Sequence, residues 1–183
     1  MADTTKLHNP HDTFHKPQNV AELKANLQKF LSFDKPHHHL ADAVFVGVID
    51  NDIQNWLQEH QKVGLITTAT IVIRRQILHA IRETKPDRQK LTDEDIKRFP
   101  DILANPEAVL YHKGQLVYVF SPTNPENQRK GKLIVRVNYT SDVRLDGQPR
   151  KRTTANSVVT AGYIPAVNLQ RKEYVVIKGG MKR

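Results

Sequence analysis

The sequence of 183 residues contains no cysteine, and this absence excludes several classes of protein. Disulfide-stabilised folds, zinc ribbons and enzymes with a thiol nucleophile all need that side chain. Long apolar runs are missing as well, since none approaches the roughly 20 residues that a membrane-spanning helix needs. Met1 to Asp12 is polar and lacks the apolar region of a secretion signal. We therefore expect a cytoplasmic or virion-associated protein with no membrane partner.

Familiar cofactor and catalytic loops are also absent. No G-x-G-x-x-G, G-x-x-x-x-G-K-[ST], G-x-S-x-G or H-E-x-x-H motif occurs, which argues against Rossmann dehydrogenases, P-loop NTPases and serine hydrolases. Three neighbouring histidines, His37, His38 and His39, are potential metal ligands. Adjacent histidines seldom converge on one ion, and Asp42 is the one acidic residue close behind them. We expect a solvated loop there, with no metal and no cofactor.

Positive charge is abundant but unevenly distributed. The chain has 28 Lys and Arg against 19 Asp and Glu. Residues 1–43 are neutral and residues 44–128 carry one excess negative charge, so residues 129–183 supply the whole excess. Such a block favours binding to a polyanion, of which nucleic acid is the commonest, although a basic face that only keeps the protein dissolved has the same composition.

Apolar periodicity predicts helices mainly in the first part of the chain and strands mainly in the last. The first expected helix covers Asn19–Phe33, with Asn19 as its N-cap, and the second runs from Asp50 or Asn51 to His60. The third covers Arg75–Thr84. The fourth begins at Thr92, and Pro100 kinks or splits it. The expected strands are Val44–Ile49, Leu65–Ile73, Ala108–Tyr111, Gln115–Phe120, Lys132–Tyr139, Val158–Ile164 and Tyr174–Lys178. Loops are expected at Pro122–Gly131 and Asp142–Thr153, and a poorly ordered tail at Met1–Pro17.

This order of elements predicts an α+β fold in which N-terminal helices pack on a small, mostly antiparallel β-sheet. We place the tail and an amphipathic helix in residues 1–43, and the α+β domain in residues 44–183. On the basic strand, we expect Lys132, Arg136 and Asn138 to face away from the core, because they alternate with apolar residues.

His79 lies on the predicted helix Arg75–Thr84, one turn after Arg75 and three residues before Arg82. Residues at these spacings share one helix surface. Neighbouring cations lower the pKa of an imidazole, which favours a neutral base near pH 7, and guanidinium groups can hold a phosphate. A histidine on a helix surface is also commonly structural or simply exposed, so both interpretations stay open here.

Hydroxyl and amide side chains follow the basic run Arg150, Lys151 and Arg152. Hydroxyl donors beside cations can orient and neutralise a phosphodiester, but threonines on the polar face of an ordinary strand give the same pattern. The members of this cluster are Thr153, Thr154, Asn156, Ser157, Thr160 and Tyr163.

Five segments, taken in order, resemble the phage-associated nuclease domains of the barnase–EndoU–colicin–RelE-like superfamily. They read IVIRRQILHAIRE, LTDEDIKRFPDILANPEAVLY, QLVYVF, KLIVRVNY and SVVTAGYI, within about residues 65–178. The resemblance implies a compact α+β fold and metal-independent cleavage of RNA, in a phage head-morphogenesis or toxin setting. Two features depart from the family's pattern: Arg82 to Lys85 stand where many members have a second histidine, and Gly162 is inserted before Tyr163.

By this resemblance, His79 is the helix-borne catalytic histidine, Thr160 the threonine of the closing strand, and Tyr163 the nearby aromatic hydroxyl. In the corresponding mechanism the 2′-OH of RNA is the nucleophile and His79 acts as base or acid. Arg82 and Arg75 hold the phosphate, which Thr160 and Tyr163 position, with Tyr163 also available as a proton donor.

RNA is therefore the expected partner, and an inhibitor or a phage structural protein is a further candidate. The side chains expected to bind the nucleic-acid backbone are Arg74, Arg75, Lys132, Arg136, Arg150, Lys151 and Arg152. The alternative to a ribonuclease is a non-catalytic nucleic-acid-binding module, or a phage structural or interaction module. A nucleic-acid-binding module needs the basic segment but not His79.

Overall fold

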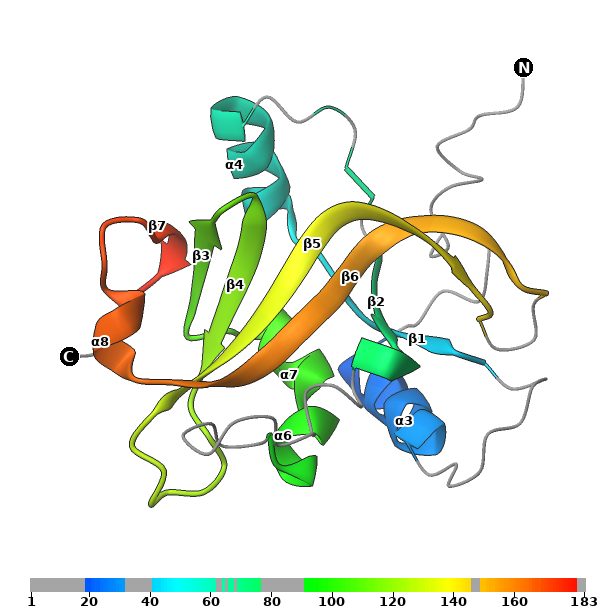
Figure 1. Ribbon diagram of the computed structural model, residues 1–183, viewed down its shortest axis with the longest axis horizontal. Helices are drawn as coiled ribbons and strands as arrows, with labels where there is room; N and C mark the ends of the chain where they lie inside the picture. The colour runs from blue at the N-terminus through cyan, green and yellow to red at the C-terminus, as the bar shows by residue number, and fades with distance from the viewer. Residues whose placement is uncertain are drawn as a thin grey trace.

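The computed structural model describes residues 19–31, 41–61, 64, 66–67, 69–76, 91–145 and 149–180. Its helices are α3 (Val20–Leu31), α4 (Asn51–Gln61), α6 (Asp93–Lys97), α7 (Phe99–Ala104) and α8 (Ala166–Leu169). Its strands are β1 (Ala43–Val48), β2 (Ala69–Ile73), β3 (Ala108–His112), β4 (Gln115–Phe120), β5 (Lys130–Val143), β6 (Lys151–Ile164) and β7 (Val175–Gly179), as Figure 1 shows.

The strands form one seven-stranded sheet with the order β1-β2-β6-β5-β4-β3-β7. Neighbouring strands are antiparallel except β2 and β6, which run parallel. This topology confirms the predicted α+β class with a mostly antiparallel sheet. The helices do not all precede the sheet, because β1 and β2 alternate with helices along the chain. The boundary predicted between residues 43 and 44 falls just inside β1.

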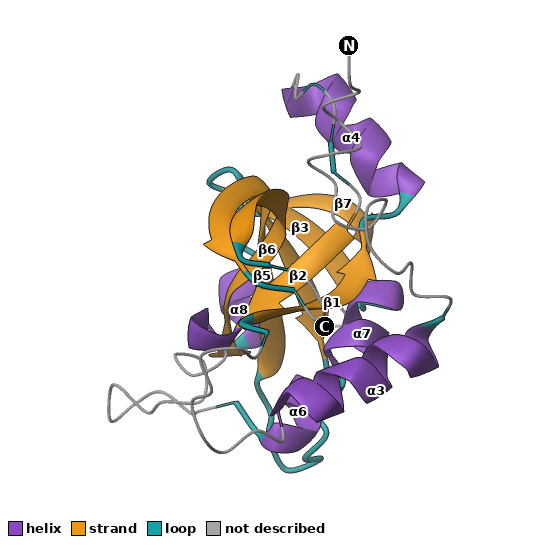
Figure 2. Cartoon of the chain, turned by 90° about the vertical axis from the view of Figure 1, so that its right-hand side faces the viewer, coloured by secondary structure: helices purple, strands orange, loops and turns teal. Residues whose placement is uncertain are grey.

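Helices α3, α6 and α7 lie together on one side of a strongly curved sheet (Figure 2). The main core forms between these helices and the sheet, where Leu27 and Phe30 of α3 meet Leu133 and Val135 of β5 in one buried cluster. The other face of the sheet carries two smaller apolar clusters. One contains Ala43, Ile71, Ile73, Val143, Leu145 and Ala155, and the other contains Ala108, Leu110, Val117, Val119 and Leu169.

Three helices begin at polar residues that the sequence marks as caps. Asn19, Asp50 and Thr92 each accept a hydrogen bond from the backbone N–H three residues later, at 2.9, 3.0 and 3.2 Å. These bonds satisfy donors that the first turn of a helix leaves open. Pro100 occupies the first turn of α7, and it splits the predicted helix into α6 and α7 because proline has no N–H to donate.

Strands β5 and β6 are longer than the sequence predicts. β5 runs to Val143 and β6 begins at Lys151, so both ends of the loop expected at Asp142–Thr153 are strand instead. The predicted bounds of the loop are wrong because the polar composition of the segment hides an apolar contact. Val143 and Leu145 are buried against Ala155 on the second face of the sheet.

The predicted outward position of Asn138 is also wrong, since the pairing of β5 with β6 is irregular between Arg136 and Tyr139. Asn138 has a φ of 53°, a left-handed conformation that asparagine tolerates well. Its side-chain oxygen accepts hydrogen bonds from Thr67 N at 2.9 Å and Thr67 Oγ1 at 3.0 Å. Its backbone N–H donates to the fully buried Asn156 at 3.0 Å. This network fixes the bend in β5.

The strand predicted over Leu65–Ile73 starts only at Ala69 among the described residues. Ile66 and Thr67 lie outside it. The backbone N–H of Thr67 donates to a side chain, and its carbonyl accepts from the Asn156 amide at 2.5 Å. Both backbone groups are therefore occupied by side chains rather than by a neighbouring strand.

Candidate nucleic-acid interface

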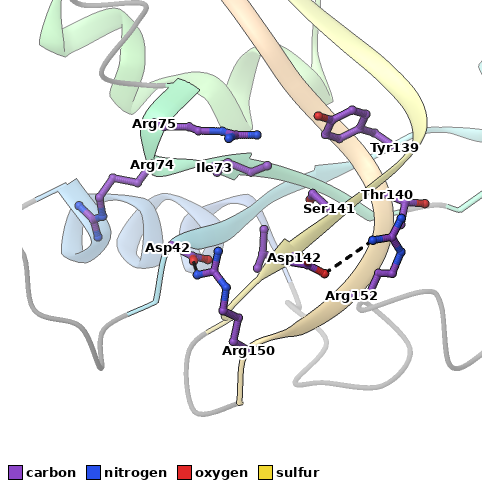
Figure 3. Close-up of a pocket in the computed structure, with 11 residues that line it drawn as sticks. Asp42, Ile73, Arg74, Arg75, Tyr139, Thr140, Ser141, Asp142, Arg150 and Arg152 are labelled. Carbon is purple, nitrogen blue, oxygen red and sulfur yellow. Dashed lines mark hydrogen bonds and ion pairs between the residues drawn. The ribbon is translucent and has the colours of Figure 1, made fainter.

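A groove rich in arginine lies between the end of β2, the residue before β1 and the far half of the β5–β6 hairpin (Figure 3). Its volume is about 550 Å³. The residues that line it are Asp42, Ile73, Arg74, Arg75, Tyr139, Thr140, Ser141, Asp142, Val143, Arg150 and Arg152. Four arginines against two aspartates give this lining two excess positive charges. We call it the arginine groove.

Asp42 joins the three segments that form the arginine groove. Its backbone N–H donates to Arg144 O at 2.9 Å, and its carbonyl accepts from Arg74 N at 2.7 Å. Its carboxylate accepts from Arg144 N and from the Arg150 guanidinium, both at 2.6 Å. The walls are thus held together before any ligand arrives, which reduces the entropy lost on binding.

Arg74 supports the wall of the groove. Its guanidinium donates to Phe30 O at 3.2 Å and Ala41 O at 3.3 Å, and it lies 4.1 Å from the centre of the Phe30 ring. The first of these bonds satisfies a carbonyl in the last turn of α3 that the helix itself leaves open. Burial lowers the pKa of the Arg74 guanidinium, and the charge of Asp42 partly offsets this effect. Arginine stays protonated at neutral pH even so.

Arg75, Arg150 and Arg152 are exposed around the arginine groove (Figure 3). The side chain of Arg150 is 59% exposed despite its bond to Asp42, and that of Arg152 is 75% exposed at 4.0 Å from Asp142. Exposed ion pairs of this kind contribute only about 0–1 kcal/mol. Arg75 makes no hydrogen bond or ion pair with the part of the chain that the structure describes. Phosphate groups can therefore engage these guanidinium groups without breaking a strong interaction.

Tyr139 and Ser141 add an aromatic ring and a hydroxyl to the groove. The guanidinium carbon of Arg136 lies 5.4 Å from the centre of the Tyr139 ring, within the range of a cation–π contact. The hydroxyl of Ser141 is buried and has no hydrogen-bond partner among the residues described. Neither Tyr139 nor Ser141 is predicted as a site residue from the sequence. The spacing of Tyr139 three residues after Arg136 on a basic strand is the signal that could have identified the tyrosine.

Three of the basic residues predicted to bind nucleic acid do not line the groove. Lys132 is half-buried in β5 and pairs with Gly162 of β6. Lys151 opens β6 opposite Val143. Arg136 reaches the groove only through its contact with Tyr139. The arginine groove therefore brings together Arg74, Arg75, Arg150 and Arg152 from the predicted set.

Tyr163, a predicted catalytic residue, belongs to a separate buried network. Its hydroxyl donates to Asp95 Oδ2 at 2.5 Å, and it also contacts Thr92 N at 3.2 Å and Thr92 Oγ1 at 3.3 Å. Asp95 is fully buried and accepts further bonds from Thr123 and Arg98. The network connects the start of α6 to β6 and to the segment after β4, which is a structural arrangement.

The two members of this acid–phenol pair have shifted pKa values. Burial by itself raises the pKa of Asp95, but the hydrogen bonds from Thr123, Tyr163 and Arg98 outweigh it and hold the pKa below its usual value. Burial raises the pKa of the Tyr163 phenol, and the hydrogen bond to Asp95 raises it further. At neutral pH the pair is therefore a carboxylate that accepts from a neutral phenol.

Thr160 does not lie beside Tyr163. β6 places Ala161 and Tyr163 on the face that packs against the main core, opposite Leu133 and Gly131 of β5. Thr160 pairs with Ile134 and projects to the other face. The two hydroxyls expected to position one phosphate are thus on opposite sides of the sheet.

The remaining predicted catalytic residues, His79 and Arg82, lie outside the described residues, as do His37, His38 and His39. Within the described ranges, no group of three or more histidine or acidic side chains is arranged to hold a metal ion. None of the described helices is long and apolar enough to cross a membrane.

Comparisons with known proteins return no match to a family model, to a curated protein or to a solved structure.

Proposed function

We propose that this protein binds nucleic acid, with the arginine groove as the contact surface for the phosphate backbone. The single observation that carries the proposal is the convergence of four arginines from two separate segments on one preformed groove. Guanidinium groups are planar and donate two parallel hydrogen bonds to a phosphate. The excess of basic residues in 129–183 adds a field that attracts a polyanion over a longer range.

Binding is better supported than catalysis by the described residues. The hydroxyl of Tyr163 is engaged with buried Asp95, and Thr160 projects from the opposite face of the sheet. The exposed side chains Arg75, Arg150 and Arg152 are of the type that neutralises phosphate charge without chemical change.

The test is a titration of a labelled 12-nucleotide RNA with the protein, followed by fluorescence anisotropy. Arg75→Gln combined with Arg152→Gln should weaken binding at least about tenfold, since a hydrogen bond to a charged group contributes on the order of 1.5 kcal/mol. Arg171→Gln is the matched control, because Arg171 is exposed near α8 and its charge is the same. Equal affinities for the wild type and the double variant would rule out the groove as the binding surface.

Ribonuclease activity is a second proposal, favoured by one observation in the sequence. His79 and Arg82 follow Arg75, a residue of the groove, by four and seven positions. The purified protein should then cut RNA but not the matching DNA in EDTA and leave cyclic phosphate ends, and His79→Ala should abolish this cleavage. Intact RNA after incubation, or cleavage that survives His79→Ala, contradicts this second proposal without affecting the first.

A further inference from the structure

Tyr139 adds an aromatic ring to the cations of the arginine groove. Its side chain and that of Arg75 extend toward one another from opposite sides of the groove (Figure 3). The ring is half-buried against the apolar cluster that includes Ile71 and Ile73, and Arg136 lies over it at 5.4 Å. These contacts hold the ring in place, so a flat group that packs on it meets a preformed surface.

Two aliphatic side chains form part of the lining of the groove. Ile73 and Val143 are 6% and 2% exposed and belong to the same cluster that supports Tyr139. Phosphate contacts alone need cations and hydrogen-bond donors, not aliphatic side chains. A nucleic-acid base, in contrast, has an apolar face that stacks on aromatic side chains and gains from leaving water.

The size of the groove limits what can enter it. Pockets of about 300–1,000 Å³ enclose molecules of drug size, and one nucleotide is of that size. The volume of about 550 Å³ is therefore suited to one base with its sugar and phosphate. A base in a duplex is stacked and paired, and it has to be flipped out of the helix before it can enter such a groove, at a cost of a few kcal/mol.

We infer that the arginine groove binds single-stranded nucleic acid, with one unstacked base against Tyr139 and the adjoining phosphates on Arg75, Arg150 and Arg152. This inference rests on the proposed function and adds the class of nucleic acid to it. Phosphates reach the guanidinium groups at the rim while the base lies against Tyr139 and the aliphatic part of the lining. A duplex, whose bases are stacked and paired, contacts only the guanidinium groups at the rim.

The first test uses three labelled probes with the wild-type protein, of which the two single strands have equal phosphate content. They are a 12-nucleotide single strand, a duplex of the same sequence, and a 12-nucleotide strand whose central sites are abasic. One base–aromatic stack supplies about 5-fold to 150-fold in affinity. The single strand should bind more tightly than both other probes by a factor in that range. Equal affinity for the intact and abasic strands overturns the inference, and this arm needs no protein variant.

The second test changes the ring. Tyr139→Leu should weaken binding of the single strand by about fivefold or more and leave duplex binding unchanged, whereas Tyr139→Phe should bind as the wild type does. Tyr174→Leu is the matched control, since Tyr174 is half-buried against His112 at the far end of the sheet. An unchanged single-strand affinity in Tyr139→Leu overturns the inference.

Different results would contradict nucleic-acid binding by the groove and its preference for a single strand. If none of the probes binds, the proposed function itself is wrong. If all probes bind equally and Arg75→Gln with Arg152→Gln weakens each of them, the groove binds nucleic acid and only the preference for a single strand is wrong.

Discussion

Arg74 and Arg152 are both predicted from the sequence to contact nucleic acid, yet the structure gives them different surroundings. Arg74 is tied to two backbone carbonyls and a phenylalanine ring, whereas the side chain of Arg152 is 75% exposed. Arg74→Gln should lower the free energy of unfolding by about 1–3 kcal/mol, because two partly buried acceptors lose their partner. Arg152→Gln should change it by less than about 0.5 kcal/mol. Urea denaturation of both variants measures the difference, and equal losses would contradict the distinction.

The lowered pKa of Asp95 makes the free energy of unfolding depend on pH. Burial alone raises its pKa, but the hydrogen bonds from Thr123, Tyr163 and Arg98 dominate and lower it. A carboxyl group with a lowered folded-state pKa contributes its full stability above the unfolded value of about 3.9. That contribution is lost as the pH falls through the lower value of the folded state. Asp95→Asn should therefore cost about 1.5–3 kcal/mol at pH 7 and progressively less in acid.

The measurement is a series of urea midpoints from neutral to acidic pH for the wild type and Asp95→Asn. The two curves should converge as the pH falls. Asp101→Asn serves as the control, because Asp101 is a partly exposed carboxylate that pairs with Lys24. Curves for Asp95→Asn and the wild type that stay parallel would show that Asp95 does not hold a lowered pKa.

At the level of the elements, the contact between β4 and β5 depends on one glycine. Gly131 pairs with Phe120, and a Cβ at position 131 would overlap the Phe120 ring. Phe120 is buried in the main core, so its ring cannot move aside freely. Gly131→Ala should destabilise the protein by about 1–3 kcal/mol, the usual cost of overpacking a core. Gly162→Ala, on the neighbouring strand with open space around it, should not, and thermal unfolding compares the two.

The elements also show which local patterns carry structural information. The caps at Asn19, Asp50 and Thr92 and the apolar strand Gln115–Phe120 are visible in the sequence because each depends on neighbours a few residues away. The bend at Asn138 is not, since its hydrogen bonds come from Thr67, which is 71 residues distant. The sequence gives no indication that these two residues meet.

At the scale of the whole molecule, the basic C-terminal part of the chain does not act as one uniform face. The structure divides its cations between the groove, which includes Arg150 and Arg152, and positions such as Lys130, which pairs with Glu107 at 2.8 Å. The sequence identifies the arginines of the groove through their charge. It does not identify Tyr139, Ser141 and Asp42, because their role depends on the curvature that brings β5 beside the end of β2.

The salt dependence of binding follows from this division. Arg75, Arg150 and Arg152 are three exposed cations on the groove, and each phosphate contact on a single strand contributes about 0.7 to the slope of log affinity against log salt. We expect a slope of about −2 for the wild type and one that is smaller by about 1.4 when Arg75 and Arg152 are both replaced by glutamine. Anisotropy titrations at several salt concentrations measure both slopes. An affinity that does not change with salt would mean that phosphate contacts do not drive binding.

The most direct test of the arginine groove as the binding surface is an NMR titration of the isotope-labelled protein with an unlabelled single-stranded oligonucleotide. If the groove binds nucleic acid, the backbone amides that shift should cluster in residues 73–75, 139–143 and 150–152, with little change in β3, β7 and α8. Shifts centred on β3, β7 and α8, with residues 73–75 and 139–143 unaffected, would place binding elsewhere and contradict the proposal.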